Sequence, residues 1–451
     1  MPPMTVASFA DSPVSQASVR TWAADVRAPG AATACALIDL EALAHNARVL
    51  AGTAGRAWMA VVKADAYGHG IEAVARTCLD AGASWLGVAQ LDEALHLRGL
   101  LDAAGVARPR SSAEPASSRE PRLLCWLVPV LSPEQAAQEG SPLREALVAD
   151  LDLSVSTLTQ LQAVRAAARA QGVMARIHVK VDTGMSRAGA VPEDLPDLAR
   201  AARASQDEGL VDVVGLWSHL SRADEPDSGS TEDHLERFRR GEQVLHQAGL
   251  RPRVRHLSAT GGLQWHPEAR LDLVRAGIGL YGFSPEPGVA TSQELGLRPV
   301  MRLQAPLVQV KRIPAGQAVS YGGTWVAPTD RWVGLVPVGY GDGVPRAAAS
   351  AGPVWVAGRR TTLVGRVCMD QVVVDLGPAR DPQGHDLPAP AAAGDLAVLW
   401  GDPQRDGEGV PTAEEWARVC STISYEIVTR LGPRVPRVAV GPSGRGWDGG
   451  R

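Results

Sequence analysis

The stretch W-M-A-V-V-K-A-D-A-Y-G-H-G, residues 58–70, leads from an apolar strand into a glycine-rich turn and places Lys63 where the strand ends. Apolar runs of strand length recur after it and alternate with helical patterns, which is typical of a parallel sheet built from strand-helix units. Eight is the number of strands that closes a TIM-type (β/α)8 barrel, so we predict an α/β fold of that kind. The eight candidate strands, all before residue 286, are 58–62, 85–89, 123–130, 147–153, 176–181, 211–217, 254–257 and 271–275.

A different pattern begins after residue 286, where glycine and proline separate short strand-like runs. One helical stretch at 412–430 interrupts these runs, which lie at 303–310, 332–338, 362–367, 372–376 and 396–400. We therefore expect a barrel domain over 35–295 and a mostly β C-terminal domain over 296–451. Residues 1–34 alternate small and polar types, and we expect a disordered extension there.

The composition favours an enzyme with a small-molecule substrate. The formal net charge is −4 and the arginines are scattered among acidic residues, so we expect no nucleic-acid partner. Five widely spaced cysteines form no C-x-x-C pair, and no His/Cys cluster accompanies them, so we expect reduced thiols and no bound metal. No export signal and no run long enough for a bilayer is evident, which predicts a cytoplasmic protein without a membrane partner.

Reactive side chains follow several of the predicted strands, at the end of the barrel where such enzymes act. Partial desolvation of Lys63 would lower its pKa and favour the neutral amine, which can attack a carbonyl carbon. Arg187 follows the fifth strand and could clamp a carboxylate, and His219 follows the sixth. Each residue also has a purely structural interpretation: a lysine that reaches for solvent, a surface salt bridge, and a histidine at the barrel rim.

Small residues and a hydroxyl follow the last two barrel strands, in S-A-T-G-G from Ser258 and R-A-G-I-G from Arg275. Barrels commonly seat a phosphate at this place, using backbone amides and a helix N-terminus. A phosphate site that faces the strand-end lysine across one barrel mouth points toward pyridoxal phosphate. A sugar-phosphate enzyme with an unrelated lysine is the competing interpretation.

Taken together, the motifs resemble the alanine racemase family, whose members have a (β/α)8 barrel, a C-terminal β domain and pyridoxal phosphate. The resemblance covers the chain from about Leu37 to Val438, in family order. The matching segments are A-V-V-K-A-D-A-Y-G-H-G from Ala60, K-V-D-T-G-M-S-R-A-G from Lys180, L-V-R-A-G-I-G-L-Y-G from Leu273, V-S-Y-G-G-T-W from Val319, V-G-Y-G-D-G from Val338, V-C-M-D-Q from Val367, S-Y-E from Ser424 and R-V-P-R from Arg434.

The resemblance implies a set of cofactor contacts. Lys63 would carry pyridoxal phosphate covalently, and Arg275 would face the pyridine nitrogen, which stays unprotonated because a guanidinium can only donate. Where the family has Asn-Ser-Ala, this chain has Ala259-Thr260-Gly261, so Thr260 would take over the phosphate contact unless nearby Ser258 does. The remaining phosphate donors would be the hydroxyls of Tyr67 and Tyr425 and the amides of Gly277 and Ile278.

The resemblance also implies two opposed bases. Racemisation removes a proton from one face of a planar carbon and delivers one to the other face. Lys63 would serve one face, and Tyr321 from the partner subunit of a homodimer would serve the other. His219 and Arg275 would support Tyr321, and His256 would orient Arg275.

Further residues match the family's substrate site and its entrance. Arg187 would bind the substrate carboxylate, and Met369 would add a backbone contact. Lys180 matches a position that is often carbamylated. Tyr340 and Asp370 would line the entrance, with Tyr425 at its inner end. Gly341 replaces the usual alanine, and we expect a looser turn there.

The predicted function is therefore racemisation of alanine, which would supply D-alanine for peptidoglycan. A serine or broad-specificity racemase would share the same machinery and differ in pocket width. A non-catalytic pyridoxal-phosphate carrier would need neither the C-terminal domain nor Tyr321. A related decarboxylase would require a cysteine or carboxylate arrangement in the second domain that the sequence does not show.

Overall fold

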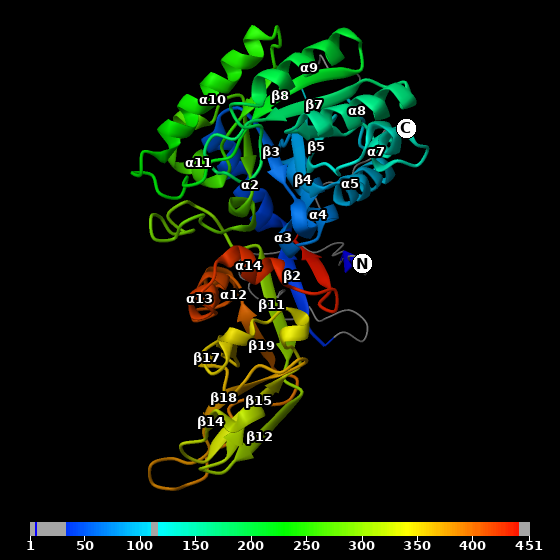
Figure 1. Ribbon diagram of the computed structural model, residues 1–451. Helices are drawn as coiled ribbons and strands as arrows, with labels where there is room; N and C mark the ends of the chain where they lie inside the picture. The colour runs from blue at the N-terminus through cyan, green and yellow to red at the C-terminus, as the bar shows by residue number, and fades with distance from the viewer. Residues whose placement is uncertain (1–4, 7–32, 110–115, 442–451) are drawn as a thin grey trace, which may run out of the picture.

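The computed structural model describes residues 5–6, 33–109 and 116–441. Figure 1 shows a barrel wrapped by helices, coloured blue to green, and an elongated, mostly β part, coloured yellow-green to red, that extends from one end of it. The predicted extension over 1–34 lies almost entirely outside the described residues. Within the described residues, no helix is long and apolar enough to cross a membrane.

Eight parallel strands form the barrel, in the order β10-β3-β4-β5-β6-β7-β8-β9. Backbone hydrogen bonds from Asp272 N to Arg255 O (3.0 Å) and from Arg275 N to Ser258 O (3.0 Å) join the segments around β9 and β10 and nearly close the ring. The predicted eight-stranded barrel is confirmed. Its strands are β3 (Ala57–Val61), β4 (Trp85–Gln90), β5 (Arg122–Leu127), β6 (Asp152–Val155), β7 (Ala175–Lys180), β8 (Val211–Trp217), β9 (Val254–His256) and β10 (Leu273–Ala276).

Two barrel strands differ most from their predicted ranges. Strand β5 ends at Leu127, and β6 begins only at Asp152. The chain shortly before β6 is the end of helix α7 (Pro142–Val148), whose buried Leu147 contributes to the same apolar run. A short apolar run does not distinguish a buried helical turn from a strand, which explains the difference.

Helices between the strands cover the outside of the barrel (Figure 1). Helix α2 (Leu40–Ala54) begins after Asp39, because the Asp39 carboxylate accepts hydrogen bonds from the amides of Glu41 (2.9 Å) and Ala42 (3.1 Å). The other helices of this part are α3 (Lys63–Gly68), α4 (Ile71–Asp80), α5 (Leu91–Ala103), α6 (Pro133–Ala137), α7, α8 (Leu158–Gln171), α9 (Leu195–Asp207), α10 (Ser230–Gln247), α11 (Thr260–Trp265), η1 (Pro267–Ala269) and η2 (Ile278–Tyr281).

A seven-stranded sheet is the base of the C-terminal part, in the order β1-β20-β2-β11-β19-β16-β17. Strand β2 (Cys35–Asp39) pairs with β20 and β11 of this sheet, although the predicted barrel range of 35–295 includes it. Its apolar sequence indicates a buried strand but not which sheet it joins. The other strands are β1 (Thr5–Val6), β11 (Met301–Pro306), β16 (Pro353–Val356), β17 (Arg359–Thr362), β19 (Leu396–Trp400) and β20 (Arg437–Val440).

A three-stranded sheet and a small hairpin complete the mostly β part, as predicted. The sheet has the order β12-β15-β18, and the hairpin joins β13 to β14. Their bounds are β12 (Gln309–Ile313), β13 (Ala318–Val319), β14 (Trp325–Val326), β15 (Arg331–Val336) and β18 (Val372–Pro378). Short 3-10 turns lie between them at η3 (Tyr321–Gly323), η4 (Tyr340–Asp342) and η5 (Arg346–Ala348).

The helical stretch predicted over 412–430 is two helices, α13 (Ala413–Val419) and α14 (Ser424–Thr429). Ser421 has a φ of 53°, and the amide of Thr422 turns back to the carbonyl oxygen of Ala417 at 2.9 Å. This closes α13 in the manner of a helix C-terminus. The break lets α14 bring Tyr425 to the barrel. Helix α12 (Pro403–Asp406) precedes the pair.

Candidate active site at the barrel mouth

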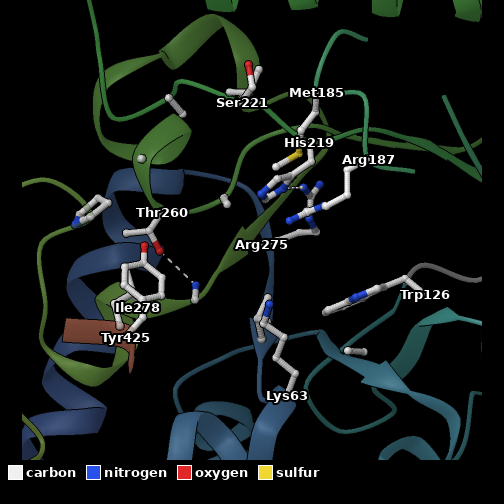
Figure 2. Close-up of a pocket in the computed structure, with 18 of the residues that line it drawn as sticks. Lys63, Trp126, Met185, Arg187, His219, Ser221, Thr260, Arg275, Ile278 and Tyr425 are labelled. Carbon is white, nitrogen blue, oxygen red and sulfur yellow. Dashed lines mark hydrogen bonds between the residues drawn. The ribbon is translucent and has the colours of Figure 1, made fainter. Parts of the chain in front are cut away.

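A cavity of about 780 Å³ opens where the barrel strands end. Figure 2 shows side chains from the barrel loops and from α14 around this space. The fold therefore brings together residues that lie far apart in the sequence. Ten of the predicted site residues line the cavity: Lys63, Tyr67, Lys180, Arg187, His219, Thr260, Arg275, Gly277, Ile278 and Tyr425.

Lys63 and Tyr67 reach the cavity through an unusual turn. Residues 64–67 have φ values of 52° to 54°, so α3 contains one turn of left-handed helix. This conformation costs roughly 1–2 kcal/mol per residue for L-amino acids. The turn is held by the Asp65 carboxylate, which accepts from the Ile71 amide at 2.8 Å, and by close packing of Gly68 on Val428. Strain concentrated at this place indicates that the placement of both side chains matters.

The surroundings of Lys63 favour its neutral form. Burial lowers the pKa of the amine, Arg187 lowers it further, Glu93 opposes this, and Arg275 adds to the lowering. The direction agrees with the prediction. A neutral amine is the nucleophilic form, so the side chain is prepared to attack a carbonyl carbon.

Thr260 and the backbone after β10 form one end of the cavity. The Thr260 hydroxyl oxygen accepts from the amides of Gly277 (3.1 Å) and Gly279 (3.4 Å). Ser258, the alternative phosphate contact, is buried and donates to the carbonyl oxygen of Ala269 at 2.7 Å. Thr260 lines the cavity and Ser258 does not, so the geometry favours Thr260. Because the Gly277 amide already has a partner, Ile278 supplies the amide that remains available.

Two phenols, Tyr67 and Tyr425, line the cavity with their ring centroids 6.2 Å apart. Tyr67 also stacks on Tyr281 at 4.6 Å. Within the described part of the chain, neither the Tyr67 hydroxyl nor the Tyr425 hydroxyl has a hydrogen-bond partner. Burial raises the pKa of both phenols, so both stay protonated and can donate to an anion.

The cavity is lined by basic side chains, with Arg187 and Arg275 as its fixed positive charges. Lys63, Lys180, Arg187 and Arg275 line it, and Asp224 carries the only carboxylate among the described lining residues. Burial and the two arginines lower the pKa of Lys180 to about 8. Positive charge that is not matched by carboxylates favours an anionic ligand.

Arg275 forms the floor of the cavity and is bonded to neutral groups. It donates to His219 Nδ1 (3.0 Å), to His256 Nδ1 (3.2 Å) and to the carbonyl oxygens of Ser218 (2.9 Å) and Leu257 (3.0 Å). Figure 2 shows the bond to His219 as a dashed line. Burial is the first cause that lowers the pKa of His219 and of His256, and Arg275 is the second. Both rings are therefore neutral, and His256 lies beneath the cavity rather than in its wall.

Tyr425 is the one predicted site residue of the C-terminal part that lines this cavity, and the other four do not reach it within one chain. Tyr321 lies between the hairpin strands β13 and β14 and is 71% exposed, and Met369 is 53% exposed. Tyr340 and Asp370 are also exposed, and Asp370 forms an ion pair with Arg434 at 2.8 Å. None of the four described residues lines the cavity.

Gly341 has a more specific role than the looser turn expected from the sequence. Its amide donates to the carbonyl oxygen of Met369 at 2.8 Å. A Cβ at this position would lie 2.6 Å from a guanidinium nitrogen of Arg434. The glycine thus leaves room for Arg434, which pairs with both Asp342 (2.9 Å) and Asp370 (2.8 Å).

Trp126 is a cavity residue that the sequence analysis missed. It lies near the end of β5, and Lys63 Nζ is 6.0 Å from its ring centroid. An aromatic residue at the C-terminal end of a barrel strand is the signal that could have identified it. The ring adds an apolar wall next to the amine.

Two family models match the chain: the alanine racemase N-terminal domain over residues 38–285 and the alanine racemase C-terminal domain over residues 300–439. The alanine racemase of Streptomyces coelicolor is 47% identical and aligns over 89% of this chain and 95% of its own length. The alanine racemase of Beutenbergia cavernae is 48% identical, over 90% and 97%. The crystal structure of alanine racemase from D-cycloserine-producing Streptomyces lavendulae superposes with a TM-score of 0.81 at 46% identity, over 91% of this chain and 98% of that one.

Proposed function

The chain belongs to the alanine racemase family, and from this premise we propose that it interconverts L- and D-alanine with pyridoxal 5′-phosphate as cofactor. One observation carries the proposal. A desolvated lysine amine, two arginines and a set of unpaired anion donors face the same cavity at the mouth of the barrel. An amine for a carbonyl group and donors for a phosphate are the two requirements of this cofactor.

The residues present fit pyridoxal phosphate. Lys63 would hold it covalently. The hydroxyls of Thr260, Tyr67 and Tyr425 and the amide of Ile278 would bind the phosphate, and they are free to donate in the described structure. Gly277 contributes by having no side chain, since a Cβ there would lie 2.9 Å from the Tyr67 hydroxyl oxygen.

When bound, the cofactor supplies the electron sink that acidifies the α-hydrogen of the amino acid. Arg275 faces the ring nitrogen in this proposal. Because a guanidinium only donates hydrogen bonds and cannot accept one from a protonated ring nitrogen, it leaves that nitrogen unprotonated. This makes the sink weaker and favours return of the proton to the α-carbon.

Two bases move the α-proton. Lys63 Nζ serves one face of the α-carbon, and its lowered pKa leaves the amine able to take up a proton. The opposite face needs a second group, and we assign this role to Tyr321 from a second copy of the chain in a homodimer. His219 supports that phenol. Its Nδ1 accepts from Arg275 at 3.0 Å, so the proton of the neutral ring is on Nε2 and can be donated outward.

The substrate is held by charge and restricted by size. Arg187 binds its carboxylate, and Lys180 beside it is the candidate for carbamylation, since a pKa of about 8 leaves an appreciable neutral fraction. Met369 of the second copy adds a backbone contact. Tyr340 and Asp370 of the second copy line the entrance, with Tyr425 at its inner end. A narrow entrance of this kind favours a methyl-sized substrate side chain.

The experiment that tests the function is incubation of the purified, cofactor-loaded protein with L-alanine and, separately, with L-serine. Chiral chromatography measures the D-isomer over time. We expect D-alanine to form much faster than D-serine. Equal rates would indicate a broad-specificity racemase, and no D-isomer from either substrate, despite bound cofactor, would indicate a carrier.

The cellular setting follows from the same proposal. The described cysteines are free thiols, and three of them, Cys35, Cys78 and Cys125, are buried, which suits a reducing cytoplasm. D-alanine made there would supply peptidoglycan synthesis. A strain that lacks this chain should need added D-alanine for growth if no second racemase is present.

A further inference from the structure

A line of buried hydrogen bonds runs beneath the cavity from Arg275 to Asp152. Arg275 is bonded to His256 Nδ1 at 3.2 Å, His256 Nε2 to His178 Nδ1 at 2.9 Å, and His178 Nε2 to an Asp152 carboxylate oxygen at 3.2 Å. Asp152, His178 and His256 are each 0% exposed. Of the four residues, only Arg275 lines the cavity.

The protons on this line can be assigned from its two ends. Arg275 can only donate, so His256 Nδ1 accepts and the neutral ring carries its proton on Nε2. That proton is donated to His178 Nδ1, and His178 in turn carries its own proton on Nε2. At the far end, burial raises the pKa of Asp152, but Arg176, His178 and Arg122 together hold it below its usual value. A charged carboxylate accepts from His178 Nε2. Both ends therefore require that each group donates its hydrogen bond toward Asp152.

The barrel is shaped around the two imidazoles. The pairing of β7 with β8 shifts register at His178, and Gly215 is opposite this ring, where any Cβ would overlap it. Trp85 packs edge-on against His178 at 5.2 Å between ring centroids, and Trp217 stacks on His256 at 5.4 Å. The rings are therefore fixed by packing as well as by hydrogen bonds.

We propose that Asp152 and His178 are positioning residues for racemisation, and that with His256 they keep Arg275 oriented as a hydrogen-bond donor at the cavity floor. The inference rests on the proposed function and extends it three residues below the cavity. Without the acceptor at His178, His256 can adopt its other tautomer, whose Nδ1 proton would face the Arg275 donor. Arg275 would then turn, and His219, which depends on the same guanidinium, would lose its fixed tautomer.

The first test is nuclear magnetic resonance of the full-length protein with nitrogen-15 labelled histidine, with and without cofactor. Nitrogen shifts distinguish the two neutral tautomers and the charged ring. We expect His178 and His256 to be neutral and protonated on Nε2 near neutral pH, with signals assigned by their loss in His178→Asn and His256→Asn. A charged ring, or a proton on Nδ1 in either residue, would overturn the proposed line of hydrogen bonds from Arg275 to Asp152.

The second test compares two substitutions of His178 with a control in the helices outside the barrel. His178→Leu removes both hydrogen bonds and should lower kcat about tenfold, the lower end of the loss seen when the orienting partner of a metal-ligating histidine is removed, with KM for alanine nearly unchanged. His178→Asn keeps an acceptor close to the Nδ1 position and should recover most of that loss. Arg144→Gln removes a part-buried arginine bond of similar length, from Arg144 to Gln171 at 2.8 Å between helices α7 and α8, and should lower stability but not kcat.

Each outcome decides something. An unchanged kcat in His178→Leu, or an equal loss in Arg144→Gln, would contradict a positioning role. If His178→Leu does not fold, the asparagine variant and the tautomer measurement still decide the question. If the wild-type protein does not racemise alanine, the proposed function fails. The line of hydrogen bonds from Arg275 to Asp152 is decided by the tautomer measurement alone.

Discussion

Lys180 is a buried amine beside Arg187 and Arg275, and its Nζ lies 4.3 Å from the ring centroid of Trp217. Burial and the arginines lower its pKa from 10.5 to about 8. Between these pH values the unfolded chain binds a proton that the folded chain does not, so stability rises with pH. The charged amine thus destabilises the folded state below about pH 8, and this cost disappears as the pH approaches 10.5.

We predict that Lys180→Met raises the free energy of unfolding by about 1–3 kcal/mol near neutral pH, since one pKa unit corresponds to about 1.4 kcal/mol. This gain in the free energy of unfolding should vanish above about pH 10.5, the pKa of the lysine in the unfolded chain. Urea titrations at the two pH values, in buffer free of carbon dioxide, measure it. Lys311→Met at an exposed position is the control and should show no such dependence. An equal gain at both pH values would show that lost charge is not the cause.

Tyr321 offers a second test at the scale of one side chain. Tyr321→Phe keeps the ring and removes only the hydroxyl that is proposed to carry the proton. Because a general acid or base contributes roughly 10²–10⁴-fold, kcat should fall by at least about 100-fold while cofactor absorbance is kept. The Lys63 face remains intact, so one enantiomer should still exchange its α-proton with heavy water. Racemisation at the wild-type rate would remove Tyr321 from the mechanism.

At the scale of elements, the left-handed turn of α3 depends on its contact with α14. Gly68 has a φ of 78°, and a Cβ there would overlap the Val428 carbonyl oxygen. Gly68→Ala should therefore destabilise the protein by about 2 kcal/mol or more and separate Tyr67 from Tyr425, weakening cofactor binding. Denaturant titration and cofactor affinity together measure this.

Gly99→Ala is the matched control, because the same methyl group is added in the middle of helix α5 with nothing within 4 Å. It should stabilise the protein by about 0.5–1 kcal/mol, the usual difference between glycine and alanine in a helix. Cofactor affinity should stay the same. If Gly68→Ala did not lower the free energy of unfolding, the left-handed turn would adjust freely to the added methyl group.

The elements also show how far the sequence predicts this structure. Strand count and strand-end residues such as Lys63 and Arg275 were predictable, because alternating units and barrel chemistry leave local patterns. The sheet that β2 joins was not, since an apolar strand does not encode its partner. His178 and Asp152 were missed because each is a single polar residue inside a strand, and only the closed barrel brings them together.

In the whole molecule, the cavity and the proposed second base are far apart. Figure 1 shows β14, whose hairpin with β13 carries Tyr321, in the extended β part away from the barrel. Tyr321 is 71% exposed in the single chain. Under the proposed function, the site is complete only if a second copy places its β part over the barrel mouth, and two-fold symmetry would then build two such sites.

Complementation tests this arrangement directly. Chains with Lys63→Ala and chains with Tyr321→Phe should each be inactive as homodimers. When they are co-expressed in equal amounts and pair at random, about half of the dimers are mixed, and each mixed dimer has one site with both bases intact. About a quarter of the wild-type activity should therefore return. If Tyr321 acted within its own chain, every mixed site would lack one base and the mixture would stay inactive, so the returned activity separates a shared site from a site within one chain.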